Sequence, residues 1–454
     1  MYYVNFCKKF NFSFFAIIVF LLAVIFAFLG TINSSAKPNS LLAVLAEGDL
    51  DTTFDTDGKV TTQIGSSRSE ALAIAVQPDG KFVASGYSIG NGNTDFALAR
   101  YNANGSLDST FGGTFGGTGK VTTDIDNTDN VSLALAIQLA DNKLVAAGCS
   151  FNSTDDDFAL VRYKTDGTLD DTFGTNGVVK TNFNNSTDCI DAVAVQTDGK
   201  IVAAGYVFNG SYFHFAIARY HSNGTLDDTF GTGGKVITEM TAFDDLARAI
   251  ALQSDGKIIV AGEANADLAV ARYNSDGSLD TSFDGDGKVV TSINLFDSAY
   301  DVVIQADGKI VAAGETGNGT NSDFAVVRYE TNGALDSLFD SDGIVTTAIG
   351  GSDEIASSLS IQAGGKIIVG GFSSNGTNDD FAVARYEPSG ALDSSFGTGG
   401  KVTTDFGGGS FDYISALAIQ SGKLIAVGSA NSNFAVAAYS LTPSKSKKRI
   451  RISF

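Results

Sequence analysis

The stretch Gly167–Tyr220 reads GTLDDTFGTNGVVKTNFNNSTDCIDAVAVQTDGKIVAAGYVFNGSYFHFAIARY and, with small changes, is written seven times along the chain. Its Leu-Asp-x-x-Phe signatures are 53 to 62 residues apart and begin at Leu50, Leu107, Leu169, Leu226, Leu279, Leu335 and Leu392. Such a period is typical of arrays in which each copy is one supersecondary unit. The 454 residues therefore form one array, although their number alone would suggest about three domains.

Each copy has the pattern of four short strands. In the first copy these are Lys59–Thr62, Ala71–Gln77, Lys81–Gly86 and Asp95–Tyr101. Asp79-Gly80 between the second and third strands favours positive φ at both positions, which is the strongest short signal for a β-hairpin. No segment of the repeats shows a sustained helical period of apolar residues. The second, third and fourth strands therefore form an antiparallel meander.

Four strands in each of seven copies predict an all-β fold, a seven-bladed β-propeller of four-stranded antiparallel blades. A β-solenoid is the main rival, but its coils are usually much shorter than about 57 residues. In a propeller the second strand would line the channel and bury both faces. The strand Lys59–Thr62 would then complete the last blade, Ala416–Tyr439, which removes a free sheet edge.

The N-terminus has the order of a secretory signal: Lys8-Lys9, the apolar run Phe14–Leu29, and the small residues Ser34–Ala36. The apolar run is also long enough for a membrane anchor. Either way we expect the repeats to be secreted, periplasmic or on the cell surface. The expected organisation is a signal peptide or anchor at 1–36, a linker at 37–47, the propeller at 48–440 and a basic tail at 441–454.

The charge of the chain is unevenly distributed. Seven of its 30 basic residues lie before residue 37 or after residue 440, whereas all 51 acidic residues lie between, so the repeats carry a formal charge of −28. Such an array repels nucleic acid and attracts cations or basic partners. We expect a monomer that binds a protein or glycan ligand and meets a membrane only through an uncleaved N-terminal segment.

The fourth strand ends in Arg-Tyr in six copies, and in each of these an aspartate follows the arginine after eight residues. Strand alternation places the arginine stem on a buried face, so its charged head needs a partner. We therefore expect structural ion pairs that clasp each copy. The pairs include Arg100 with Asp108, Arg162 with Asp170, and Arg219 with Asp227. In the seventh copy the arginine is replaced by Ala438, and no Leu-Asp-x-x-Phe follows it.

With these motifs the chain resembles the delta-60 repeat family. The resemblance rests on seven copies of L-D-x-x-F-[GD]-x-x-G-[KIV]-V, D-G-K-[IF]-[VI]-x-[AV]-G and D-F-A-x-x-R-Y, and covers Leu50 to Tyr439. It implies propeller-forming units of exported bacterial proteins that share no enzymatic activity. The last copy departs from the pattern at Ser421-Gly422 and Ala438, where the ring would close.

The function is expected at the end of the propeller where the copies differ. The loops between the third and fourth strands are SIGNGNT (88–94), SFNSTDD (150–156), VFNGSYF (207–213), EANA (263–266), ETGNGTNS (315–322) and FSSNGTND (372–379). Variable polar loops on a rigid scaffold are a common place for binding. We expect a non-enzymatic scaffold that binds through this face. The alternative is an extracellular carbohydrate-active hydrolase or lyase that uses carboxylates at the channel mouth.

The candidate carboxylates lie eight residues before the glutamine that ends each second strand. They are Asp188, Asp245, Asp297, Glu354 and Asp412. A ring of carboxylates could hold calcium, a cationic ligand or a polyhydroxylated one. Alternatively, each could cap its own strand through hydrogen bonds to the backbone. We favour the cap, and keep the ligand site as the second interpretation.

Three copies carry Asp-x-Asp-Gly, at Asp55 and Asp57, Asp284 and Asp286, and Asp340 and Asp342. The motif resembles the start of a calcium loop, but the bidentate glutamate that should follow is missing, so turn chemistry is the better interpretation. We expect no catalytic residue and no cofactor, with calcium as the one cation to consider. Cys149 and Cys189 would lie in neighbouring blades, where either free thiols or a disulfide would fit.

Overall fold

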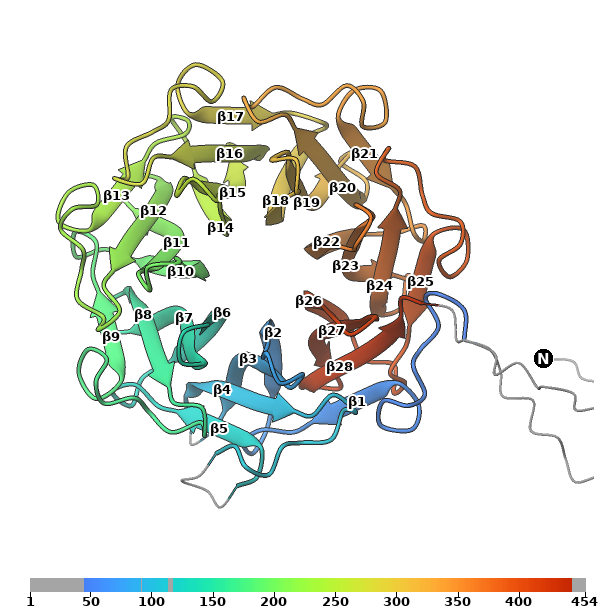
Figure 1. Cartoon of the computed structure of the whole chain (residues 1–454), viewed down its shortest axis with the longest axis horizontal. Coiled ribbons are helices and arrows are strands. Elements are labelled where there is room, and N and C mark those ends of the chain that lie inside the picture. The colour runs from blue at the N-terminus through green and yellow to red at the C-terminus, as the bar shows by residue number, and fades with distance from the viewer. Residues whose placement is uncertain (1–44, 91, 113–116, 443–454) are drawn as a thin grey trace, which may run out of the picture. The chain divides into compact units, whose positions relative to one another are not determined.

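The computed structural model describes residues 45–442 except 91 and 113–116. In this part the chain forms seven four-stranded antiparallel sheets. The sheets stand around a central channel as the blades of a propeller, with β2, β6, β10, β14, β18, β22 and β26 innermost (Figure 1). The predicted seven-bladed all-β propeller is confirmed.

The blades follow one another in the order of the sequence. Blade 1 holds β2 (Ser69–Val76), β3 (Phe82–Ile89), β4 (Thr94–Tyr101) and β5 (Lys120–Thr123). Blade 2 holds β6 (Asn130–Gln138), β7 (Lys143–Phe151), β8 (Asp156–Tyr163) and β9 (Val178–Thr181). Blade 3 holds β10 (Asp188–Val195), β11 (Ile201–Phe208), β12 (Phe213–Tyr220) and β13 (Lys235–Thr238). Blade 4 holds β14 (Asp245–Leu252), β15 (Ile258–Ala264), β16 (Asp267–Tyr273) and β17 (Lys288–Thr291).

The remaining blades repeat this arrangement. Blade 5 holds β18 (Phe296–Ile304), β19 (Ile310–Gly317), β20 (Ser322–Tyr329) and β21 (Ile344–Thr347). Blade 6 holds β22 (Glu354–Ile361), β23 (Ile367–Ser374), β24 (Asp379–Tyr386) and β25 (Lys401–Thr404). Blade 7 holds β26 (Tyr413–Gln420), β27 (Lys423–Ala430), β28 (Asn433–Ser440) and, as its outermost strand, β1 (Lys59–Thr62).

The ring is closed by the N-terminal strand, as predicted. Strand β1 pairs with β28 in a register that sets Lys59 opposite Ala437. The closure also includes the residues before β1, because the Asp51 amide donates to the Ala438 carbonyl at 2.8 Å and the Gly397 amide donates to the Glu47 carbonyl at 2.9 Å. Glu47, at the end of the segment expected to be a linker, therefore packs on blade 6.

The hydrophobic core lies between the blades, in seven clusters that each draw residues from two neighbouring sheets. Each interface also carries a buried hydrogen bond between a tyrosine and a threonine. The tyrosine ends the third strand of one blade, which is the fourth strand of the sequence copy, and the threonine lies in the outermost strand of the preceding blade. Tyr220 Oη donates to Thr181 Oγ1 at 2.9 Å, and Tyr439 Oη donates to Thr404 Oγ1 at 2.9 Å. The repeated Arg-Tyr and Lys-Val-Thr-Thr motifs are thus joined across every blade interface.

The innermost strands are less buried than predicted. In β2, Leu72, Ile74, Ala75 and Val76 are partly exposed, because one face of the strand meets the channel. The expectation that this strand buries both faces is wrong in that part.

No helix in the described part of the chain is long and apolar enough to cross a membrane. The expected signal peptide or anchor at 1–36 and most of the basic tail lie outside the described residues.

Candidate functional site

The arginine and aspartate motifs are ion pairs inside the blades. Arg219 Nε lies 2.7 Å from Asp227 Oδ2, and its guanidinium carbon lies 4.5 Å from the centre of the Phe230 ring. A second nitrogen of Arg219 donates to the Ser275 carbonyl of the next blade. Arg100–Asp108 and Arg162–Asp170 have the same geometry, at 2.7 and 2.8 Å. These side chains are buried and hold neighbouring blades together, although Arg162 and Arg219 each also contribute to the lining of a cavity.

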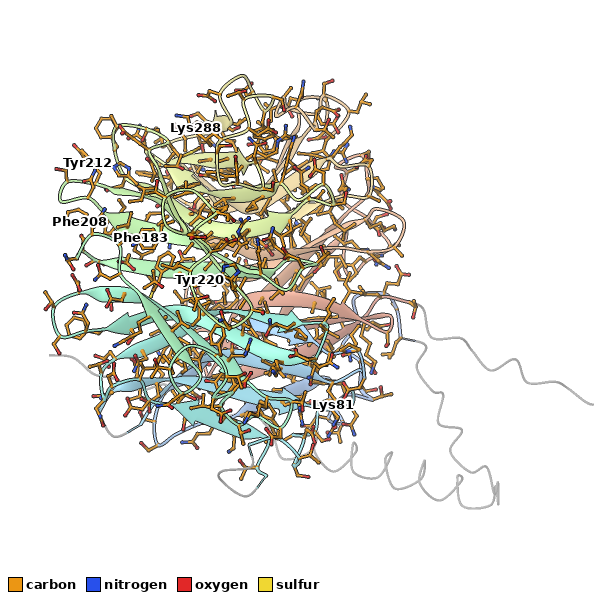
Figure 2. The ribbon with its side chains drawn as sticks, turned by 60° about the vertical axis from the view of Figure 1, so that its left-hand side comes forward. Lys81, Phe183, Phe208, Tyr212, Tyr220 and Lys288 are labelled. Carbon is orange, nitrogen blue, oxygen red and sulfur yellow. A yellow bond between two sulfur atoms is a disulfide. The ribbon has the colours of Figure 1, made fainter. Side chains whose placement is uncertain are left out.

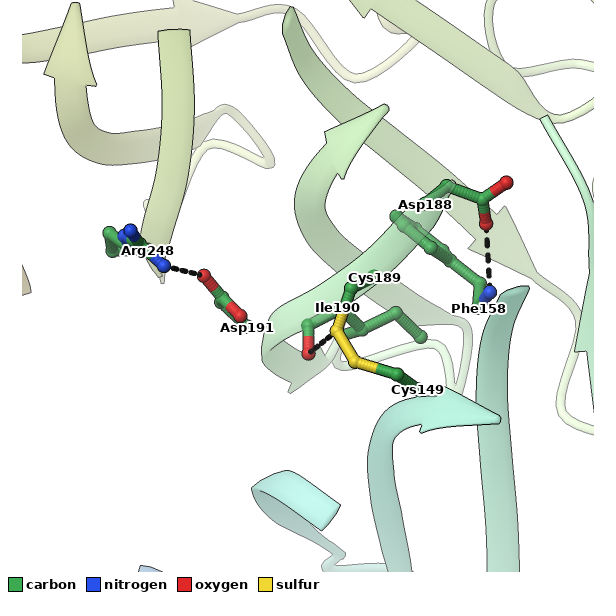
Figure 3. Close-up of a disulfide and its surroundings, with 7 residues drawn as sticks. All are labelled: Cys149, Phe158, Asp188, Cys189, Ile190, Asp191 and Arg248. Atoms are coloured by element: carbon green, nitrogen blue, oxygen red, sulfur yellow. Dashed lines mark hydrogen bonds and ion pairs between the residues drawn. A yellow bond between two sulfur atoms is a disulfide. The ribbon is translucent and has the colours of Figure 1, made fainter. Parts of the chain in front are cut away.

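The ligand interpretation of the five candidate carboxylates does not fit their burial, since all five are at most 2% exposed. Asp188 accepts from the amide of Phe158 at 2.8 Å (Figure 3) and from that of Phe183, also at 2.8 Å. Asp245, Asp297, Glu354 and Asp412 likewise accept from backbone amides of the loop before their strand. They fix the entry of five of the seven innermost strands and do not form an exposed ring at the channel mouth.

Burial has an electrostatic cost at Asp188. It raises the pKa of this carboxyl to about 8, although the hydrogen bonds from Phe183 and Phe158 oppose the shift. The carboxyl of Asp412 also has a raised pKa, mainly through burial. Asp412 lies with Asp380 and Asp405 in a group of carboxylates whose oxygens are within 4.8 Å of one another.

The Asp-x-Asp-Gly motifs form turns. Asp55, Asp284 and Asp340 have φ between 44° and 49°, at positions where other copies place glycine. The second aspartate of each motif accepts from the amide two residues later, at 2.9 Å in all three cases. Asp57, Asp286 and Asp342 therefore shape the start of the outer strand.

Sequence reasoning missed the side chains that line the channel. Every innermost strand carries a β-bulge at the same place, as between Ala247 and Ala249 in β14. A bulge turns its extra residue away from the regular alternation. The seven extra residues line one cavity within the channel, and they are Leu72, Leu133, Asp191, Arg248, Tyr300, Ser357 and Ser415.

A glycine in the neighbouring strand makes each bulge fit. A Cβ atom on Gly262 would lie 1.9 Å from the Leu246 carbonyl oxygen, and one on Gly205 would lie 1.9 Å from that of Cys189. The same close approach occurs in all seven blades. Each sequence copy carries this glycine in its third strand, which is the second strand of the blade. The recurring glycine is the signal that could have located the bulge.

The channel is charged on the side of blades 3, 4 and 5. Arg248 donates to Asp191 at 2.8 Å (Figure 3) and lies 3.9 Å from Glu263. Burial raises the pKa of Asp191 to about 6 against the opposing charge of Arg248. Tyr300 Oη donates to Glu315 at 2.8 Å. Arg248 thus pairs with two carboxylates, and the third, Glu315, is bound to the neutral hydroxyl of Tyr300.

A cleft opens above this charged side on the variable face. The connection between β15 and β16 is a tight turn of two residues, Asn265 and Ala266, whereas the loops at 209–212 in blade 3 and 318–321 in blade 5 have four. The short turn leaves a cavity of about 570 Å³, which Glu263, Glu315, Ser298 and Ser322 help to line. Its size is within the range of small-ligand sites.

Aromatic side chains stand at the rim of this cleft. Tyr212, Phe243 and Phe296 line it, and the Tyr212 and Phe243 rings meet edge to face with their centres 5.7 Å apart. Phe243 is 50% exposed and Phe296 is 60% exposed. Figure 2 shows Tyr212 at one side of the propeller and Lys81, from a β-hairpin of the uniform face, at the other.

One further sequence prediction, and a histidine in blade 3, concern neighbouring blades. Cys149 of β7 and Cys189 of β10 form a disulfide between blades 2 and 3, with their Cα atoms 4.9 Å apart (Figure 3). His214 is buried, with Nδ1 3.4 Å from Asp245 and Nε2 2.5 Å from Asn209 Nδ2. The histidine fills a place that aspartate takes in most copies.

The fold and the sevenfold motif define a β-propeller repeat protein. Six segments match the family described as "Domain of unknown function (DUF5122) beta-propeller", and they are 77–111, 139–173, 196–230, 253–283, 305–339 and 362–396. Each runs from the end of an innermost strand to or near the phenylalanine of Leu-Asp-x-x-Phe. In blade 7 this stretch is divided between the two ends of the chain, which accounts for six matches in seven blades. No curated relative matches the sequence.

Solved structures share the fold at low identity. Virginiamycin B lyase from Staphylococcus aureus is 11% identical, with a TM-score of 0.51 over 84% of this chain and 98% of that one. Ulvan lyase, a polysaccharide lyase, is 12% identical, with a TM-score of 0.51 over 84% of this chain and 96% of that one. Sqt1 from Chaetomium thermophilum is 14% identical over 82% of each chain, with a TM-score of 0.42. The likeness to the two lyases concerns the propeller fold alone.

Proposed function

We propose that this protein is a non-enzymatic binding scaffold that holds a ligand or protein partner on its variable loop face. The observation that carries the proposal is the cleft that the two-residue turn at Asn265 and Ala266 opens between longer loops. Binding sites are commonly concave, with an apolar lining and a few convergent polar groups. The exposed aromatic rim and the carboxylates of this cleft supply both.

Export is part of the proposal. The Cys149–Cys189 disulfide supports an oxidising compartment, because such bonds are rare in reducing ones. Assignment to the delta-60 repeat family, whose units occur in exported bacterial proteins, rests on the three repeated motifs.

The test is to fill the cleft. Asn265 and Ala266 are replaced by the four-residue sequence of 318–321, Asn-Gly-Thr-Asn, so that the longer loop fills the cleft in blade 4. Blade 7 offers a matched control, since the connection at 431–432 is also a two-residue turn. Both variants and the parent chain are screened by thermal shift against glycans, basic and acidic peptides, calcium and EDTA.

We expect at least one ligand to raise the Tm of the parent and of the blade 7 variant, but not that of the blade 4 variant. A shift that survives filling of blade 4, or that both variants lose equally, contradicts the proposal. A screen without any shift contradicts it as well.

A hydrolase acting on glycans is the second candidate. The five carboxylates predicted from the sequence are buried and bound to backbone amides, but Glu263 and Glu315 line one cleft together with one of the five, Asp297. Glycoside hydrolysis needs two carboxyl groups about 5–10 Å apart. Release of reducing sugar from a glycan panel, abolished by Glu315→Gln and kept by Asp228→Asn on the opposite face, would support this candidate. Equal release by both variants would refute it.

A further inference from the structure

We propose that the cleft in blade 4 takes the cationic side chain of a lysine or arginine in a protein partner. The inference rests on the proposed function and names the ligand class for that site. It joins three features of the cleft: its excess of carboxylates, its exposed aromatic rim and an unpartnered buried hydroxyl.

The carboxylates of the cleft exceed its cations. Glu263 and Glu315 both line the cavity and are partly exposed. Arg248 lies closest to Asp191, at 2.8 Å, and only more distantly approaches Glu263, at 3.9 Å. Glu315 receives a neutral hydrogen bond from Tyr300. The lining therefore keeps negative charge that one further cation would neutralise.

The rim of the cleft suits the same ligand. Phe243, Phe296 and Tyr212 present aromatic rings at its edge, and Leu295, which precedes Phe296 in the chain, is 65% exposed. A cation over an aromatic face is attracted by the ring, and the aliphatic stem of lysine or arginine packs against apolar surface. A long side chain could thus cross the rim with its stem and reach the carboxylates with its charged end.

Ser298 supplies an independent indication. It lines the cavity, is 4% exposed, and its Oγ has no hydrogen-bond partner among the described residues. Buried hydroxyls are normally partnered. The corresponding positions in the other blades are Glu70, Val131, Cys189, Leu246, Ile355 and Tyr413. A donor entering the cleft would satisfy the hydroxyl of Ser298, and no other blade has a serine at this position.

The charge of the whole chain favours a protein partner with a basic segment. The formal net charge of −21 steers basic surfaces toward the propeller. The apolar residues at the rim would cover side chains next to the inserted lysine or arginine, which a free polyamine lacks.

Fluorescence anisotropy of the full chain tests the inference with a labelled Gly-Lys-Phe-Lys-Gly peptide. Its arginine counterpart, its Nε-acetyl-lysine counterpart and spermidine as competitor are the other probes. We expect the lysine and arginine peptides to bind about tenfold or more tightly than the acetylated peptide, because acetylation removes the charge. Equal binding of the acetylated peptide overturns the inference, as does full competition by spermidine at the affinity of the peptide.

Matched variants locate the site. Glu263→Gln with Glu315→Gln, and separately Phe243→Ala with Phe296→Ala, should each weaken binding by about tenfold. Asp171→Asn with Asp228→Asn and Leu338→Ala make similar changes at exposed residues of the opposite face and should leave binding unchanged. Glu263→Gln alone serves as the test if the double variant unfolds. Equal weakening in the control variants overturns the inference.

The outcomes separate this inference from the proposed function. If a neutral glycan binds, is lost on filling blade 4, and the peptides do not bind, the ligand class is wrong and the binding cleft stands. If filling blade 4 changes no binding at all, both are wrong.

Discussion

The guanidinium of Arg385 contacts the carboxylate of Glu47, a residue 338 positions earlier in the chain. Nη2 of Arg385 makes this contact, whereas in the other five clasps Nη1 of the arginine donates to a backbone carbonyl of the next blade, as Arg219 does to Ser275. Arg385 is fully buried. Glu47 therefore fastens blade 6 to the segment that leads into the closing strand.

Glu47→Ala should lower the free energy of unfolding by about 2 kcal/mol, because it removes a charged hydrogen bond from a buried guanidinium. Urea unfolding followed by circular dichroism measures the change. Glu387→Ala is the control, since Glu387 pairs with Lys366 but is 40% exposed. Equal losses in the two variants would show that Glu47 has no special part in closure.

The clasp within a blade should behave as one unit. Arg219→Met and Asp227→Asn each remove one side of a pair whose side chains are 5% and 0% exposed. We expect the double variant to lose less stability than the sum of the single variants, by about 1–3 kcal/mol. Additive losses would mean that Arg219 and Asp227 are stabilised independently.

Acid should weaken the clasps. Burial opposes ionisation of Asp227, but hydrogen bonds from Thr229 and Lys200 outweigh it and hold its pKa below the ordinary value of 3.8. A folded pKa below the unfolded one means that the clasp stabilises the protein above about pH 4 and that this stability is lost as the pH falls further. Unfolding free energies measured from pH 7 to pH 2 should fall below pH 4, and less steeply in Asp227→Asn. The same slope in both proteins would contradict the assignment.

The bulge in each innermost strand should depend on its glycine. Gly262→Ala would place a Cβ atom 1.9 Å from the Leu246 carbonyl oxygen, so the backbone must shift. We expect a loss of about 3 kcal/mol or more, as for other severe steric changes in a core. Gly351→Ala is the control, since nothing lies within 4 Å of its Cβ position and its φ is not in the left-handed region. Similar Tm values for the two variants would contradict this account.

The disulfide should hold blades 2 and 3 together. Cys149 and Cys189 are 40 residues apart, and closing a loop of that length in the unfolded chain is worth about 4 kcal/mol by chain entropy. Reduction, or Cys149→Ser with Cys189→Ser, should lower the unfolding free energy by up to that amount. Mass spectrometry after thiol alkylation, with and without reductant, checks the bond itself. Two alkylated cysteines without reductant would contradict it.

The blade architecture could be predicted because it depends on repeated local signals. Asp-Gly turns, alternating apolar strands and the position of Lys59–Thr62 before the first complete copy were enough to predict the ring and its closure. The environment of Asp51, the aspartate of the first Leu-Asp-x-x-Phe motif, could not be predicted from sequence order. Asp51 lies beside Ala438 across the ring closure, where the other blades have an arginine, and Lys423 pairs with it at 2.8 Å.

The cleft could not be predicted for a different reason. A β-bulge changes which face a side chain takes, and its mark is a glycine in the neighbouring strand and not a residue of the bulged strand itself, so Arg248 and Tyr300 look like ordinary members of an apolar strand. The acids that stand out in the sequence, such as Asp188, precede the bulge in their strand and accept hydrogen bonds from backbone amides. The short loop at 263–266 was visible in the sequence, but it leaves a cleft only because the loops at 209–212 and 318–321 on either side are longer.

The closing strand also sets the order of events during synthesis. Lys59–Thr62 emerge from the ribosome long before Phe434–Ala437, with which they pair. Until the end of the chain arrives, the outer strand of blade 7 has no sheet to join, and the two faces that will meet at the closure remain uncovered. A chain that stops before Phe434 would thus leave β1 without a partner and expose unpaired strand edges at the open ring, which favour pairing with another chain.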